Sequence, residues 1–160
     1  MKTRSHLPSW HRLDNAANVF PLISHKNFSN VFRLAVELKM PVDPKLLQKA
    51  LDITLPNFGN FNFKIRSGFF WYYFEPTNTR LLIQKESLRP CSYVDTKIRN
   101  HHLFRILYYN NRISLEVFHA ITDGTGATNF LKALTVNYLK LVNGEGVPEQ
   151  VPRIKVKSEL

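Results

Sequence analysis

The chain has 160 residues, 44% of them hydrophobic and 21% charged, and a formal net charge of +10. These proportions are ordinary for a globular protein and exclude a disordered tail, a collagen-like repeat and a disulfide-rich miniprotein. One domain is expected at this length, and no apolar run reaches the roughly 18 residues of a membrane span. Because the first residues show no signal peptide and the single cysteine, Cys91, cannot form an internal disulfide, we expect a cytoplasmic protein.

The basic side chains are spread along the chain. Six basic and two acidic residues lie in 1–40, thirteen and seven in 41–143, and three of each in 144–160. No run of five or six like charges occurs, and no zinc-finger, basic-zipper or RNA-recognition pattern is present. We therefore expect no nucleic-acid partner, although a positive field favours an anionic small molecule.

The first part of the chain predicts a strand followed by a helix. Residues 1–29 show no period and are expected to be an irregular segment lying on the domain. Residues 30–40 alternate, and one of the two sets is wholly apolar, which is typical of a strand with one buried face. Asp43 as N-cap and Pro44 at the first helical position then begin a helix, which residues 56–60 end.

A pair of strands is expected next, over 61–65 and 68–75, joined as a hairpin. The aromatic run at 69–74 resembles a ligand cage, but a strand covered on both faces explains it as well, and we favour the strand. Residues 76–100 are read as a polar connection that contains the short apolar stretch 81–83.

The last part predicts a hairpin and a long helix. Residues 102–109 and 112–118 are rich in strand-forming side chains, and the Asn110-Asn111 pair between them favours a tight turn. From Gly126 the apolar residues recur at helical spacing until Asn143-Gly144. The shared helix face comprises Ala127, Phe130, Leu131, Leu134, Tyr138, Leu141 and Val142.

This order of elements predicts an α+β fold. We expect a two-layer sandwich, with a mostly antiparallel sheet and the helices on one face. The domain is expected over residues 1–146, and residues 147–160 form a tail or the start of a connection to a further domain.

One segment, from His119 to Gly124, carries a chemical signature. His119 stands where a strand ends, and Gly124, Gly126 and Ala127 allow the backbone to turn sharply and approach a ligand. A histidine in such a place can accept a proton from a hydroxyl or thiol near neutral pH. Asp123 could fix the local geometry through hydrogen bonds or an arginine pair.

Two alternatives concern the histidines. His119 could be a structural histidine whose hydrogen bonds are satisfied at a strand end. His101 and His102 form a tempting metal pair, but adjacent strand residues point to opposite faces and no Cys or carboxylate cluster accompanies them. We therefore expect no metal site.

The His-x-x-x-Asp-Gly segment resembles the signature of the chloramphenicol-acetyltransferase-like superfamily of coenzyme A-dependent acyltransferases, which includes the condensation domains of nonribosomal peptide synthetases. The likeness extends to its bacterial alcohol-acetyltransferase-like branch and runs from about residue 10 to 143. The further matching segments are 12–17, 20–21, 32–38, 42–44, 47–51, 68–73 and 115–120.

The resemblance implies a role for each residue of the motif. His119 would be the general base that deprotonates a small alcohol or amine, which then attacks the thioester of an acyl-coenzyme A, with acetyl as the expected acyl group. Asp123 would be structural, pairing with an arginine and ordering the loop, and Gly124 would allow the turn. No metal and no acyl-enzyme are implied, so Cys91 has no required role and is expected to be a small buried side chain.

The chain departs from the family pattern in two ways. Condensation domains usually carry a second histidine directly before the catalytic one, and Phe118 stands there, which favours simple acyl transfer over peptide condensation. Most members are two related halves with the histidine between them, so a C-terminal half or another copy of the chain would have to complete the site. The alternative is a non-catalytic half-domain that acts as a binding or assembly module.

Overall fold

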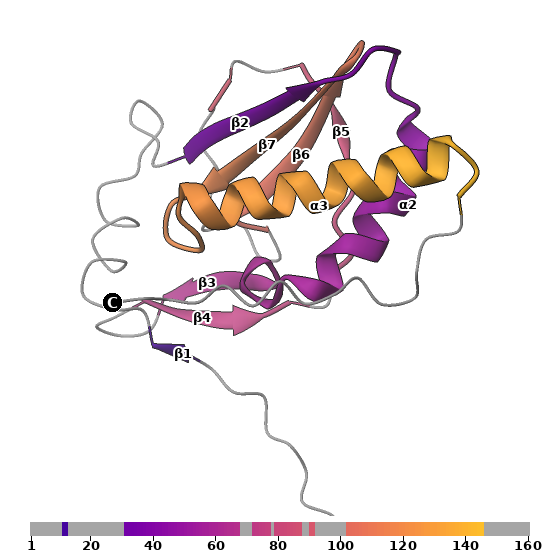
Figure 1. The fold of residues 1–160 in the computed structure, drawn as a ribbon. Coiled ribbons are helices and arrows are strands. Elements are labelled where there is room, and N and C mark those ends of the chain that lie inside the picture. The colour runs from indigo at the N-terminus through magenta and orange to yellow at the C-terminus, as the bar shows by residue number, and fades with distance from the viewer. Residues whose placement is uncertain are drawn as a thin grey trace, which may run out of the picture.

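The structure is a computed structural model, and it describes residues 11–12, 31–67, 72–77, 79–87, 90–91 and 102–145. Figure 1 shows the helices α2 (Pro44–Thr54) and α3 (Gly124–Val142) lying between the larger sheet and the smaller one. The four-stranded sheet has the order β2 (Val31–Glu37), β7 (Arg112–Phe118), β6 (Phe104–Tyr109) and β5 (Gln84–Lys85), and the smaller one β1 (His11–Arg12), β4 (Tyr72–Pro76) and β3 (Phe63–Ser67). The predicted α+β fold is confirmed, although its strands form two sheets.

Antiparallel pairing dominates both sheets. Only the contact of β5 with β6 is parallel among the described strands. The β3–β4 hairpin and the β6–β7 hairpin were both expected from the sequence. The bounds of β3 differ from the predicted 61–65, because residue 61 belongs to a short 3-10 helix and the strand continues to Ser67, which pairs with Tyr72. The short strands β1 and β5 were not expected. Strand β1, residues 11–12, pairs with β4 and lies in the N-terminal segment that was expected to be irregular. Strand β5 pairs with β6 and lies just after the apolar stretch 81–83.

Strand β2 lies at the edge of the four-stranded sheet and pairs with β7 along its whole length. Val31 faces Phe118 in the register, and Glu37 faces Arg112. Its apolar residues Phe32, Leu34 and Val36 are half-buried and pack against the core. Among the described strands β2 has one neighbour and β7 has two, which agrees with the deeper burial of the β7 side chains.

Helix α2 (Pro44–Thr54) begins and ends as expected. The carboxylate of Asp43 accepts hydrogen bonds from the backbone N–H groups of Lys45 (2.8 Å) and Leu46 (3.2 Å), and Pro44 occupies the first turn. Two short 3-10 helices, η1 (Leu55–Asn57) and η2 (Gly59–Phe61), follow it. They bring Phe61 into the core, where its ring stacks on that of Phe130 at a centroid distance of 4.3 Å.

Helix α3 (Gly124–Val142) begins two residues before the predicted start, because Asp123 is its N-cap. The predicted inner face is confirmed, with Ala127, Phe130, Leu131, Leu134 and Tyr138 buried. The helix ends at Asn143, and Gly144 follows with φ +71°, a left-handed conformation that glycine adopts without a steric penalty.

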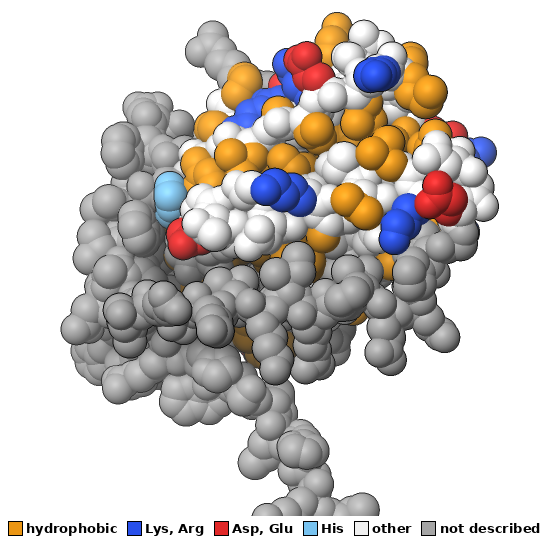
Figure 2. Space-filling view, in the orientation of Figure 1, with side chains coloured by type: hydrophobic (Ala, Val, Ile, Leu, Met, Phe, Trp, Pro, Cys, Tyr) orange, Lys and Arg blue, Asp and Glu red, His pale blue; other side chains and the backbone are white. Residues whose placement is uncertain are grey.

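The outer side of α3 also carries apolar residues, since Val136 and Leu139 are 50% and 41% exposed. Figure 2 shows hydrophobic side chains distributed over the face of the molecule formed by α3 and β2. The helix is therefore more apolar on its solvent side than burial of the inner face requires.

Some predictions lie outside the described residues. These are the N-terminal segment apart from 11–12, the side chains of most of the aromatic run at 69–74, and the proposed boundary at residues 146–147. Within the part of the chain that the structure describes, no helix is long and apolar enough to cross a bilayer.

Candidate active site

His119 is the first residue after β7, and its side chain is exposed. The chain turns over residues 119–121, where the N–H of Ile121 donates to the carbonyl oxygen of Phe118 at 3.1 Å. Because strand side chains alternate between faces, His119 continues the side of Val117, while Phe118 points to the opposite side. The structure thus places the predicted base at a sheet end, open to solvent.

The imidazole of His119 contacts an aromatic ring of the neighbouring strand. The ring centroids of His119 and Phe32 are 4.2 Å apart, and the ring planes are inclined by 38°. Phe32 pairs with Val117 in the register of β2 and β7, so both rings lie on the same side of the sheet. Sequence reasoning missed this neighbour, because it depends on a register between distant strands.

Asp123 caps helix α3. Its carboxylate accepts a hydrogen bond from the backbone N–H of Gly126 at 2.7 Å, which satisfies one of the free donors of the first turn. The implied arginine partner is not found among the described residues, where no ion pair of Asp123 occurs. The geometry thus shows a capping role, four residues after His119.

The two glycines of the turn differ in their surroundings. A Cβ added at Gly124 would meet no described atom within 4 Å, whereas one at Gly126 would overlap the hydroxyl of Thr122 and lie 3.3 Å from Oδ1 of Asp123. Neither glycine has a left-handed φ. The close approach in this turn therefore requires glycine at 126, and the space beside Gly124 stays open.

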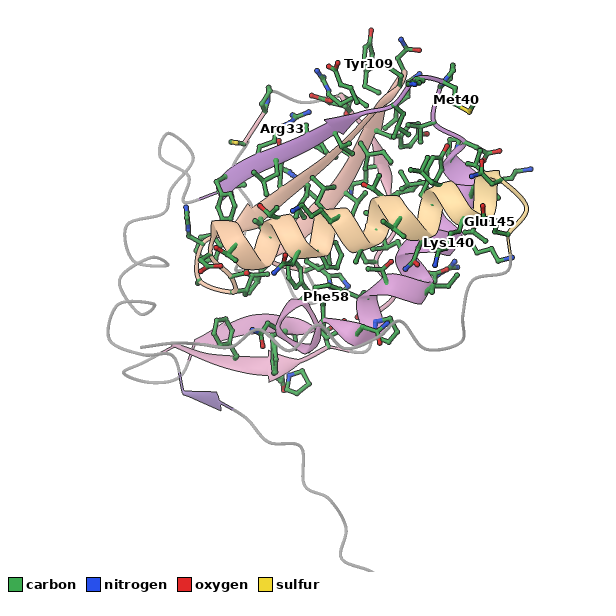
Figure 3. All side chains as sticks on the ribbon, viewed as in Figure 1. Arg33, Met40, Phe58, Tyr109, Lys140 and Glu145 are labelled. Atoms are coloured by element: carbon green, nitrogen blue, oxygen red, sulfur yellow. The ribbon has the colours of Figure 1, made fainter. Side chains whose placement is uncertain are left out.

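Buried charges lie on the side of the four-stranded sheet that faces away from the helices. Glu116 is 1% exposed and forms ion pairs with Arg33 (3.2 Å) and Arg105 (2.7 Å). Glu86 pairs with Arg33 (2.8 Å) and Arg112 (3.1 Å). We call these five residues the ionic face, and Figure 3 shows Arg33 on the side of β2 away from α3.

The ionic face shifts the proton affinities of its members. The hydrogen bond with Glu86 raises the pKa of Arg33, and the same bond lowers the pKa of Glu86. Each partner stabilises the charged form of the other, so both stay ionised at neutral pH. The sequence could not reveal this cluster, because its members come from three strands and a loop.

Cys91 lies against the ionic face. Its backbone N–H donates to Oε1 of Glu116 at 2.7 Å. Burial raises the pKa of its thiol, which disfavours the thiolate that a nucleophilic cysteine needs. This agrees with the expectation that Cys91 has no chemical role, although its side chain is half-buried and not fully buried.

The described residues also form a cavity and include a buried histidine. A cavity of about 450 Å³ is lined by residues of 52–62 and 76–81, and none of them belongs to the segment from His119 to Gly126. His102 is buried, with Nε2 2.7 Å from the carbonyl oxygen of Thr79. Its neighbour His101 lies outside the described part, in which no three metal-binding side chains cluster.

Comparisons with known proteins give a consistent fold. A scan against protein-family models and a search of curated proteins both found no match. Among solved structures, the chain is similar to the starter condensation domain of rhizomide synthetase RzmA, with a TM-score of 0.68 and 11% identity over 89% of this chain and 40% of that chain. The first condensation domain of the CDA synthetase gives 0.65 and 17%, over 90% of this chain and 43% of that one.

A third similar structure is the X-domain from teicoplanin biosynthesis, with a TM-score of 0.64 and 16% identity over 95% of this chain. The chain spans about 36–43% of the length of these three structures. The structural similarity establishes the fold. Because the sequence identities are low, the activity has to be argued from the site. The chain therefore has the fold of these condensation domains.

Proposed function

We propose that this chain is the histidine-bearing part of an acyltransferase. The enzyme would move an acyl group from coenzyme A to a small alcohol or amine, and we propose acetyl as this group. The observation that carries the proposal is the position of His119, exposed at the end of β7 and next to the start of α3, on a condensation-domain fold. The alcohol-acetyltransferase-like branch is proposed on the sequence resemblance alone.

The proposed reaction needs one base. A ring nitrogen of His119 accepts the proton of the acceptor hydroxyl or amine, and the oxygen or nitrogen attacks the thioester carbonyl. The carbon–sulfur bond then breaks, and the coenzyme leaves as a thiol after taking up the proton. A positioned general base of this kind contributes about 10²–10⁴-fold to a rate.

The turn after His119 supports the base. Asp123 fixes the first turn of α3 through its bond to Gly126, so the segment between strand and helix has a defined shape. Gly124 leaves open space at the helix start, which we assign to substrate.

The remaining walls of the site would come from a partner. The chain spans only about 40% of the length of the starter condensation domain, and no described cavity adjoins His119. We propose that a C-terminal half or another copy of this chain supplies the contacts to the acyl donor. Light scattering would separate a monomer from an assembly of several copies.

The test is thiol release from acetyl-coenzyme A with a panel of small alcohols and amines. It uses the protein expressed from its complete reading frame. We expect His119→Ala to lower the rate by about 10²–10⁴-fold, and Cys91→Ala to leave it close to wild type. Thiol release that is unaffected by His119→Ala, or absent with every acceptor, would contradict the proposal.

The second candidate is a non-catalytic binding or assembly module. The observation that favours it is that the chain spans only about 40% of the length of the starter condensation domain. In that case coenzyme A would bind weakly or not at all in calorimetry, and His119→Ala would change neither binding nor assembly.

A further inference from the structure

We propose that Phe32 is a positioning residue for His119, whose ring orientation it fixes by direct contact. The kinetic part of this inference rests on the proposed function, but the contact itself is a property of the folded chain. Phe32 touches no reacting atom in this role and acts only through the imidazole.

The contact follows from the register of the two strands. Phe32 faces Val117 across the β2–β7 pair, and His119 lies two residues further on the same side of the sheet. The ring centroids of Phe32 and His119 are 4.2 Å apart, slightly closer than the roughly 4.5–7 Å usual for paired aromatic rings. Because His119 stands just beyond the last residue of β7, strand pairing alone does not orient its side chain.

Phe32 is itself held in place from both sides of β2. Its ring is half-buried and packs against the core. The next residue, Arg33, points to the ionic face, where it donates hydrogen bonds to Glu116 (3.2 Å), Glu86 (2.8 Å) and Ser114 (2.7 Å). Three side-chain bonds at the adjacent position restrict the backbone that carries Phe32.

The contact suits a group that gains and loses a proton. An aromatic face accepts a neutral imidazole by stacking and an imidazolium by a cation–π interaction. The imidazole can thus keep one orientation while a proton moves to and from it. The side chain of His119 as a whole is exposed, so the contact with Phe32 does not bury the imidazole.

The experiment compares Phe32→Leu with Phe32→Tyr, which keeps the ring. Phe58→Leu is the matched control, because Phe58 is also half-buried and aromatic but packs on Phe61 and Phe130. The imidazole proton resonances of His119 are followed by NMR in the 160-residue chain and assigned by their loss in His119→Gln. Thiol release from acetyl-coenzyme A is measured in parallel.

We expect Phe32→Leu to move the His119 resonances downfield, since the shielding ring is gone, and to lower kcat by about 3- to 10-fold with little change in KM. Phe32→Tyr should retain both values, and Phe58→Leu should change neither. His119 resonances that stay in place in Phe32→Leu would overturn the inference, whatever the rates show. Moved resonances, together with no thiol release by the protein expressed from its complete reading frame, would uphold the contact and contradict the proposed function.

Discussion

The two faces of the four-stranded sheet are built on different principles, although one strand contributes to both. On the helix side, Leu115 and Val117 are fully buried among apolar side chains. On the ionic face, Glu116 is equally buried but is surrounded by arginines. The sequence of β7 alternates as an amphipathic strand does, yet its second face is not solvated. The alternation of polar and apolar residues therefore identifies which residues share a face of the sheet, but it does not tell whether that face is exposed to solvent.

The largest effect is expected from Glu116→Ala, which leaves two largely buried arginines without their shared carboxylate. Removing one partner of a buried ion pair typically destabilises by about 3–5 kcal/mol. Urea unfolding followed by circular dichroism measures the free energy of unfolding. Asp52→Asn, which breaks the exposed pair with Arg80, is the control and should leave the midpoint near wild type. A loss below roughly 1 kcal/mol in Glu116→Ala would mean that the ionic face contributes little.

Leu115→Ala tests the helix side one residue away. It creates a cavity at a position with 0% exposure, for which we expect a loss of about 2–5 kcal/mol. Leu82→Ala, at a side chain that is 59% exposed, should change stability by less than about 0.5 kcal/mol. If Leu115→Ala were as mild as this control, the helix side would not be a packed core.

A smaller effect is expected from Asp123→Ala, which removes the cap of α3 and should cost about 1 kcal/mol. Asp123→Asn keeps a capping side chain and should unfold like wild type. The same pair of variants tests the implied arginine partner. If Asp123→Asn is as stable as wild type but slower in thiol release, the carboxylate charge has a role beyond capping; equal rates would limit Asp123 to the cap.

The two glycines of the turn should respond differently to substitution by alanine. Gly124→Ala is expected to raise stability by up to about 1 kcal/mol, because it restricts the unfolded chain without a described clash. Gly126→Ala must displace the Thr122 hydroxyl and should be less stable than Gly124→Ala by about 1 kcal/mol. Thermal unfolding of both variants measures the difference. A stable but inactive Gly124→Ala would support the assignment of this space to substrate.

The smallest expected effect is a difference between the two faces in how the free energy of unfolding depends on pH. Because the hydrogen bond from Arg33 lowers the pKa of Glu86, the unfolded chain takes up this proton more readily than the folded one. The contribution of Glu86 is then fully present above the unfolded pKa of about 4.5 and is lost as pH falls through the lower folded pKa. Glu86→Gln should lack this part of the acid-dependent loss, whereas the deficit of Leu115→Ala should be nearly independent of pH. If the free energy of unfolding depended on pH in the same way in wild type, Glu86→Gln and Leu115→Ala, the role assigned to Glu86 would be contradicted.

Local signals predicted the parts of the fold that local chemistry determines. Asp43 and Pro44 begin α2, and Asn110 adopts φ 49° in the turn between β6 and β7, as its residue type allows. The apolar spacing of α3 gave its buried face. Its start was set two residues late because Asp123 was considered for the site and not as the cap.

Features that depend on the pairing of distant segments could not be predicted from the sequence. Glu116 and Arg33 are 83 positions apart, and nothing in either neighbourhood marks them as partners. The contact between Phe32 and His119 depends on the same register. The sequence motif identified His119 as the candidate base, but the residues around His119 could be identified only from the folded structure.

The register of β2 against β7 also has a consequence for the order of folding. The β6–β7 hairpin closes through the two residues Asn110 and Asn111, so it can form early at a small cost in loop-closure entropy. Strands β2 and β7 are about eighty residues apart in the chain, and contacts of such long range form slowly. During synthesis the ring of Phe32 must wait for β7 to emerge. We therefore expect the environment of His119 to be among the last parts of the chain to mature, and to be the first to open when the edge strand detaches.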